Sequence, residues 1–187
     1  MSSQLDNCIP KTVHVVGKNL ISHGNVSLDC LIPDCTWSGI SENILDHFQQ
    51  VHPDHIWWNG EKDKIITVHD ITKPSHKVEL IVAHSHLFWF HIKNDLESGN
   101  LYAACQHIAT PNDDPNCRFM IRTVLKDKTC VSCVSCSTET RPHTEDLDKV
   151  LIDQKCAVRP IKKLSCFTNE NNDVSFDVSI SKIYYFQ

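Results

Sequence analysis

Hydrophobic positions near the start of the chain follow the period of an α-helix. Between residues 41 and 51, apolar side chains recur at spacings of three and four, which places them on one side of a helix. They are Ile44, Leu45, Phe48 and Val51. Ser41 stands where a side chain could cap the first turn, and Pro53 stands where a helix has to stop. The pattern therefore predicts one short amphipathic helix.

From Lys64 onward, the pattern changes to short runs rich in Val, Ile, Phe and Tyr, separated by residues that favour turns. A short helical segment is expected within Glu145–Asp153, where Leu147, Val150 and Leu151 are apolar. Many short strands at near-regular spacing favour an antiparallel β-sandwich. The expected strands lie near Ile65–Val68, Val78–Ala83, Leu87–Ile92, Leu101–Cys105, Arg118–Leu125, Thr129–Val134, Cys156–Arg159 and Val174–Ile180.

The predicted helix lies within a run of four metal-binding residue types with the spacing C-x4-C-x11-H-x4-H. The four residues are Cys30, Cys35, His47 and His52. Zinc takes four nitrogen or sulfur ligands in a tetrahedron, and a closed set of four makes a structural site. We therefore expect one structural Zn²⁺ in a small ββα-like finger, with Trp37 filling its core. His55 is an alternative fourth ligand, and the metal-free interpretation is two buried cysteines and two surface histidines.

Composition narrows the class of protein. The chain has 187 residues, a formal net charge of -5 and 10 Cys. Its first twenty residues contain Asp6, Lys11 and Lys18 and no apolar core of signal-peptide length. Together with the zinc-type cysteine spacing, this favours reduced thiols and a cytoplasmic or nuclear location. The longest apolar region, Val78 to Ile92, is interrupted by Glu79 and three histidines, so no membrane span is expected.

The chain divides into three segments in this interpretation. Residues 1–29 show no clear domain; Cys8 and His14 lack the partners of a second finger, and 25–27 is a glycosylation sequon. Residues 30–58 form the finger, and 59–187 form the sandwich. We expect Trp57, Trp58 and Gly60 to mark a joint at which the finger packs against its neighbour.

A finger followed by this strand series resembles the Seven-in-absentia (SINA/SIAH) family. The stretches that carry the resemblance are Pro33–Gly39 (PDCTWSG), Ile44–Phe48 (ILDHF), Gly60-Glu61, Asp70-Ile71 with Pro74, Gln154–Val158 (QKCAV) and Asn172–Ile180 (NDVSFDVSI). The resemblance covers about residues 30–187. It implies a mostly β chain in which a SIAH-type finger packs on a TRAF-like antiparallel β-sandwich. In that family the sandwich binds substrates of ubiquitination and forms dimers.

Residues 1–29 lack the ligand sets of the RING and of the first finger that usually precede this region in the family. The resemblance then implies a substrate-binding adaptor in ubiquitin-dependent degradation that is not a ligase by itself. It would form a homodimer, or a heterodimer with a RING-bearing relative. One alternative is a regulator or inhibitor that dimerises with such a ligase. Another is a purely structural scaffold.

The family binds extended peptides along an exposed strand, using an acidic residue followed by tryptophan. The matching strand here reads Val78-Glu79-Leu80-Ile81, so the tryptophan is absent and the peptide preference does not carry over. We expect these four residues to form a docking edge beside Ile65–Val68, with Glu79 orienting the partner. The alternative is a central strand with two core faces.

The alternative from a different class of function is a zinc finger that binds nucleic acid. Such a finger needs cations that contact phosphates. There is no Lys or Arg from Cys30 to Ile56, whereas four residues are acidic: Asp34, Glu42, Asp46 and Asp54. This charge pattern disfavours nucleic acid as the partner.

Three further groups of residues have the composition of metal or catalytic sites. Cys130, Cys133 and Cys136, with His143 nearby, could bind a second metal, but residues three apart on a strand face opposite ways. His84 and His86 share one strand face and His91 takes the other. Cys105-Gln106-His107 is reminiscent of a thiol protease, but we expect its thiol and imidazole to point to opposite faces. Buried thiols and edge histidines are the simpler interpretation.

Overall fold

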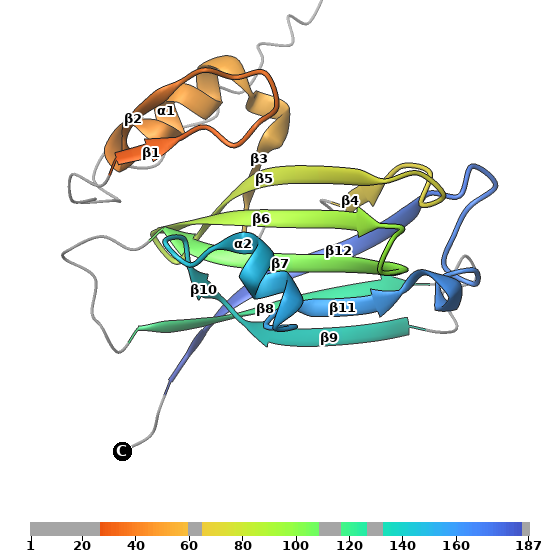
Figure 1. The fold of residues 1–187 in the computed structure, drawn as a ribbon. Helices are drawn as coiled ribbons and strands as arrows, with labels where there is room; N and C mark the ends of the chain where they lie inside the picture. Colours follow the sequence, from red (N-terminus) through yellow and green to blue (C-terminus); the bar gives the residue numbers. More distant parts are fainter. Residues whose placement is uncertain (1–26, 60–64, 109–116, 127–132, 185–187) are drawn as a thin grey trace, which may run out of the picture.

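The computed structural model describes residues 27–59, 65–108, 117–126 and 133–184, and these are mostly strand. Two sheets face each other, and a small helical unit sits at one side of the larger sheet (Figure 1). The expectations that concern Cys8, His14, the sequon, Gly60-Glu61 and Cys130 lie outside the described residues.

The larger sheet is built around an antiparallel meander of three long strands, β5, β6 and β7. The turn between β5 and β6 consists of His84 and Ser85, both with positive φ (51° and 66°), as a tight two-residue hairpin requires. The short strand β3 pairs parallel with β5, while β10 and β11 both pair with β7. The bounds are β3 Ile56–Trp58, β5 Ser75–Ala83, β6 His86–Asp95, β7 Asn100–Ile108, β10 Arg141–Pro142 and β11 Ala157–Pro160.

The smaller sheet has the strand order β4-β12-β8-β9 and is antiparallel throughout. Its bounds are β4 Ile65–Val68, β8 Arg118–Lys126, β9 Cys133–Glu139 and β12 Val174–Ile183. Phe88 and Phe90 of the larger sheet and Phe119 and Phe176 of the smaller one are fully buried and belong to one shared core. The mostly β class and the face-to-face packing of two sheets agree with the expectation, except that β3 and β10 pair parallel.

The outer face of the larger sheet is covered by helical segments (Figure 1). Helix α2 (Leu147–Ile152) packs Val150 and Leu151 against Ala104 of β7. The Asp146 carboxylate caps this helix by accepting a hydrogen bond of 2.9 Å from the Lys149 amide. Within the described ranges, none of the helices is both long and apolar enough to cross a membrane.

Most predicted strands appear with ends shifted by a few residues, and Ile65–Val68 appears with the predicted bounds. The strand expected at Thr129–Val134 is displaced: β9 begins at Cys133 and continues to Glu139, while 129–132 are outside the described residues. The predicted strand ends at Val134 and leaves out Ser135, Ser137 and Thr138. They are held in a strand because β9 pairs with β8 along its whole length.

Candidate metal centre

The finger is made of a small hairpin followed by a helix. Strands β1 (Ser27–Asp29) and β2 (Ser38–Ile40) pair antiparallel, and α1 spans Ser41–Val51. The loop between the strands carries both cysteines. It is closed by hydrogen bonds from the Cys30 amide to the Trp37 carbonyl (2.9 Å) and from the Cys35 amide to the Ile32 carbonyl (3.2 Å). The hairpin therefore presents two thiols toward the helix that carries the histidines.

The structure brings the four predicted ligands together. One ligand atom each from Cys30, Cys35, His47 and His52 lies within 4.8 Å of the other three, and the cluster could hold a metal ion. The Sγ atom of Cys35 is 3.5 Å from Nε2 of His47. Two tetrahedral ligands with Zn–S of about 2.3 Å and Zn–N of about 2.0–2.1 Å are also separated by about 3.5 Å. The donor set and its spacing fit zinc.

Burial sets the protonation of these groups without metal. It raises the pKa of the Cys30 thiol to about 11, and the neighbouring Cys35 adds to this, so Cys30 is protonated at neutral pH. Burial lowers the pKa of His47, and the neighbouring His52 lowers it further. The pKa of His52 is lowered by burial and by the neighbouring His55. The imidazoles are thus neutral and ready to bind a cation, whereas the Cys30 thiol has to lose a proton first.

Aromatic contacts fix the orientation of the ligand rings. Trp37 stacks on His47 with ring centroids 4.7 Å apart and planes within 8°. Gly39 is required beside this pair, because a Cβ atom there would lie 2.6 Å from Cζ2 of Trp37. The prediction that Trp37 packs within the finger is confirmed.

His55 faces the sandwich, so its placement separates the two candidates for the fourth ligand. Its Nδ1 atom lies 3.2 Å from the Val78 carbonyl oxygen and 3.8 Å from Oε2 of Glu79. His52, and not His55, belongs to the ligand cluster. His55 instead connects the finger to β5.

The helix packs its buried side on the outer face of the larger sheet. Ile44 and Phe48 are fully buried in one cluster with Leu80 of β5 and Trp89 of β6. The rings of Phe48 and Trp89 are 5.5 Å apart. Finger and sheet share this core, so the predicted packing of one on the other is confirmed.

Two details of the predicted helix are wrong. Val51 is 57% exposed, because the helix turns it away from the sheet in its last turn. The N-cap residue is Ile40, with no side-chain cap; Ser41 is already the first helical residue and is fully buried.

The joint after the finger is a strand of the sheet. Trp57 is 2% exposed and enters the core between the sheets, whereas Trp58 is 38% exposed. Asn59, which no sequence pattern singled out, joins the two sheets. Its Nδ2 donates to the Ile180 carbonyl (2.9 Å), its Oδ1 accepts from the Ile180 amide (3.2 Å), and its own amide donates to the Val82 carbonyl (2.8 Å).

The predicted docking edge is wrong. Residues Leu80 to Val82 of β5 are paired with β3 on one side and with β6 on the other, and Ile65–Val68 lies in the opposite sheet. The four proposed partner-binding residues are buried, at 2% exposure or less: Val78, Glu79, Leu80 and Ile81. Glu79 contacts Lys77, with Nζ 2.9 Å from Oε1. Sequence alone did not reveal that a strand from the finger pairs with Leu80 to Val82.

The cysteines outside the finger differ in burial within the described residues. All eight cysteines there are free thiols. Cys105 and His107 share the inner face, since they are two residues apart, so the expectation of opposite faces is wrong. Complete burial raises the pKa of Cys105 strongly, so it remains a thiol. Cys133 is exposed, whereas Cys136 packs against the core. The two residues therefore lie on opposite faces of β9, as predicted.

The predicted histidine group splits into separate contacts. His84 lies in the hairpin turn, with Nε2 3.0 Å from the Ile180 carbonyl oxygen. His86 Nδ1 lies 3.1 Å from Nε2 of His107. His91 lies on the outer face beside His76.

The chain matches no family model in a scan of protein families, and a search of curated proteins gave no significant match.

Proposed function

We propose that this chain is a substrate-binding adaptor in ubiquitin-dependent protein degradation, built as a Seven-in-absentia-type zinc finger fixed to a TRAF-like sandwich. The observation that carries the proposal is the shared core in which Phe48 of the finger packs on Trp89 of the sheet. Such a core makes the finger a rigid part of a larger binding module. It leaves the finger helix no free apolar face of its own.

The charge of the finger supports a protein partner over a nucleic acid. The segment from Cys30 to Ile56 exposes four acidic side chains, which are Asp34, Glu42, Asp46 and Asp54. The same segment has no Lys or Arg to neutralise phosphates.

The edge strand β9 is the most suitable place for an extended partner segment. In the described part of the chain, β9 pairs with β8 only and forms the end of the smaller sheet. Its seven residues contain no Pro or Lys, the residues that commonly block an exposed edge. Ser135 and Ser137 are small and exposed, so a partner's backbone could approach and add a strand.

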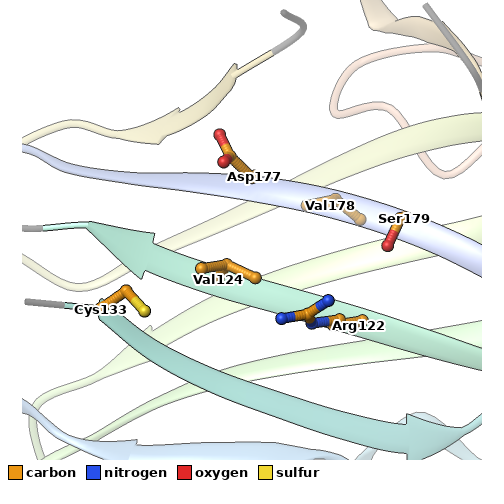
Figure 2. Close-up of a pocket in the computed structure, with 6 residues that line it drawn as sticks. All are labelled: Arg122, Val124, Cys133, Asp177, Val178 and Ser179. Atoms are coloured by element: carbon orange, nitrogen blue, oxygen red, sulfur yellow. The ribbon is translucent and has the colours of Figure 1, made fainter. Parts of the chain in front are cut away.

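A shallow cavity lies beside the start of this edge. It has a volume of about 390 Å³ and opens on the outer face of the smaller sheet. Figure 2 shows Arg122 and Val124 on β8 between Cys133 of β9 and Asp177 of β12. Backbone hydrogen bonds along β9 would supply affinity, and this cavity, with one cation and one acid, would select a side chain of the partner.

Affinity capture from cells tests the proposal. We expect the chain to retain ubiquitin-ligase components and their substrates, and Ser137→Lys on the β9 edge to lose the substrates. Ser181→Lys is the matched control, because Ser181 is also exposed but lies on the central strand β12. Equal capture by wild type and Ser137→Lys would contradict docking at β9.

A reconstituted reaction separates an adaptor from an inhibitor. With E1, E2 and ubiquitin alone, we expect no chains to form. When a RING-bearing relative is supplied, an adaptor increases ubiquitination of a captured substrate. A decrease would instead identify the chain as an inhibitor of that ligase.

A further inference from the structure

A buried cationic nitrogen lies in β11, the strand that follows helix α2. The Nη2 atom of Arg159 is shielded from solvent, and no group in the described residues accepts a hydrogen bond from it. Buried polar groups normally have a hydrogen-bond partner, and an arginine keeps its positive charge inside a protein. The guanidinium of Arg159 is therefore a donor that lacks its acceptor.

Alternation along β11 places this side chain between the two sheets. Ala157 belongs to the core that the sheets share. Val158 packs on the other face, against the cluster that contains Val150 and Leu151 of α2. Residues two apart on a strand share a face, so Arg159 lies on the inner side with Ala157. It is less buried than Ala157, as expected of a side chain that extends from the core toward the open side of the sandwich.

The same open side is bordered by β9. In the described residues, β11 pairs with β7 alone and β9 pairs with β8 alone, so each strand has one free edge. The two strands belong to different sheets but contact each other, and they lie side by side in Figure 1. Cys136 of β9 packs against the same core as Ala157. The inner side chain of Arg159 is thus directed toward the side on which β9 lies.

The charge around Arg159 favours an acidic ligand. The whole chain has a net charge of -5, but residues 159–163 contain three cations and no acid. Two of these cations, Lys162 and Lys163, are exposed just beyond the strand. A hydrogen bond between a guanidinium and a carboxylate is about twice as strong as one between neutral groups. An acidic side chain therefore complements this side of the sandwich better than a neutral or basic one.

We propose that Arg159 selects the partner by binding an aspartate or glutamate carboxylate of the segment that adds to β9. The inference rests on the proposed docking at β9. In an added strand, alternate side chains point between the sheets and toward the outer face. The acidic side chain takes an inward position beside Arg159. Its neighbours in the segment point to the outer face, where the cavity lined by Arg122 lies.

The stability of the free protein tests whether the guanidinium lacks a partner. An unpaired buried charge destabilises a fold, and methionine keeps the apolar part of the arginine side chain. Arg159→Met should therefore unfold at the same urea concentration as wild type or at a higher one. A guanidinium that is already paired in the free protein predicts the opposite, because loss of one partner of a buried pair is strongly destabilising. A clearly lowered unfolding midpoint would overturn the proposal.

Two heptapeptides test the chemistry of the ligand. The probe acetyl-TVTETVT-amide places its Glu between two Val on one face of a strand, and the control peptide has Gln in place of Glu. Backbone amide shifts of β9, followed by NMR up to millimolar peptide, give both the Kd and the binding site. Wild type should bind the Glu peptide roughly tenfold or more tightly than the Gln peptide. Arg159→Met should lose this preference, and Arg159→Lys should keep part of it because the charge remains.

Ser137→Lys separates this inference from the proposed docking. A lysine on the edge strand blocks strand addition, so it should weaken binding of both peptides by the same factor. If wild type binds both peptides at β9 with equal affinity, the role of Arg159 is refuted and docking at β9 stands. If neither peptide shifts the β9 signals of wild type, docking at β9 fails and the inference fails with it.

Discussion

Replacement of Phe48 by alanine tests whether finger and sandwich are one cooperative unit. Phe48 is fully buried, and its ring lies 5.5 Å from that of Trp89 across the finger–sheet boundary. Truncation of a buried Phe to Ala costs about 3–5 kcal/mol. Roughly 0.5–1.5 kcal/mol of this should come from the aromatic pair itself. Because a domain is stabilised by only about 5–15 kcal/mol in total, the loss should be large.

The assay is urea unfolding of zinc-loaded protein, followed by both tryptophan fluorescence and far-UV circular dichroism. We expect one transition by both probes, shifted to lower urea in Phe48→Ala. Val51→Ala is the matched control on the same helix: Val51 is 57% exposed, so its effect should stay within about 0.5 kcal/mol. Trp89→Ala and the double variant complete a cycle that measures the coupling between the two rings.

Two results would refute the reasoning. One is a loss below about 1 kcal/mol for Phe48→Ala, which would mean that the buried ring contributes little to stability. The other is a separate low-urea transition for the finger while the sandwich unfolds as in wild type. Zinc content has to be measured in each variant, because Phe48 directly follows the ligand His47.

Three further predictions concern metal and pH. His47→Ala should lose the finger's zinc and unfold the finger, because structural zinc supplies roughly 10–16 kcal/mol in finger peptides; a folded, metal-free finger by NMR would contradict this. Zinc binding near pH 7 should release at least about one proton, since the pKa of Cys30 is raised to about 11, so affinity measured by calorimetry should rise with pH. Hydrogen bonds from Lys73 and, to a smaller extent, from Thr72 lower the pKa of Asp70 from 3.8 to about 2. The stability that the ionised Asp70 carboxylate contributes is therefore complete above pH 3.8 and is lost as the pH falls toward 2. In an acid titration, the stability of Asp70→Asn should depend less on pH than that of wild type in this range.

The sequence predicted the parts of the structure that depend on neighbouring residues. The ligand cluster was predictable because Cys30 and Cys35 lie in one loop, and His47 and His52 lie on and just after one helix. Strand positions were predictable because alternation and turn residues are local signals. The clearest example is the strand Ile65–Val68, whose observed bounds are the predicted ones.

Strand pairing was not predictable in the same way, because it depends on residues far apart in the chain. Nothing in Val78–Ala83 indicates that Ile56–Trp58 pairs alongside it, or that Ile65–Val68 joins the other sheet through β12. Asn59 was missed for the same reason. Its amide is important only because the fold places Ile180 beside it. The contact between His76 and His91 likewise depends on the register of two strands.

The position of β12 has a consequence for synthesis on the ribosome. This strand, at 174–183, lies between β4 and β8 and joins strands that precede it by more than fifty and more than a hundred residues. The meander β5-β6-β7 can form as soon as it emerges, since its contacts are local. The second sheet cannot close until β12 has left the exit tunnel. During that interval the inner faces of β6 and β7, with Phe88 and Phe90, are uncovered, and the nascent chain depends on chaperones or on rapid completion to avoid aggregation.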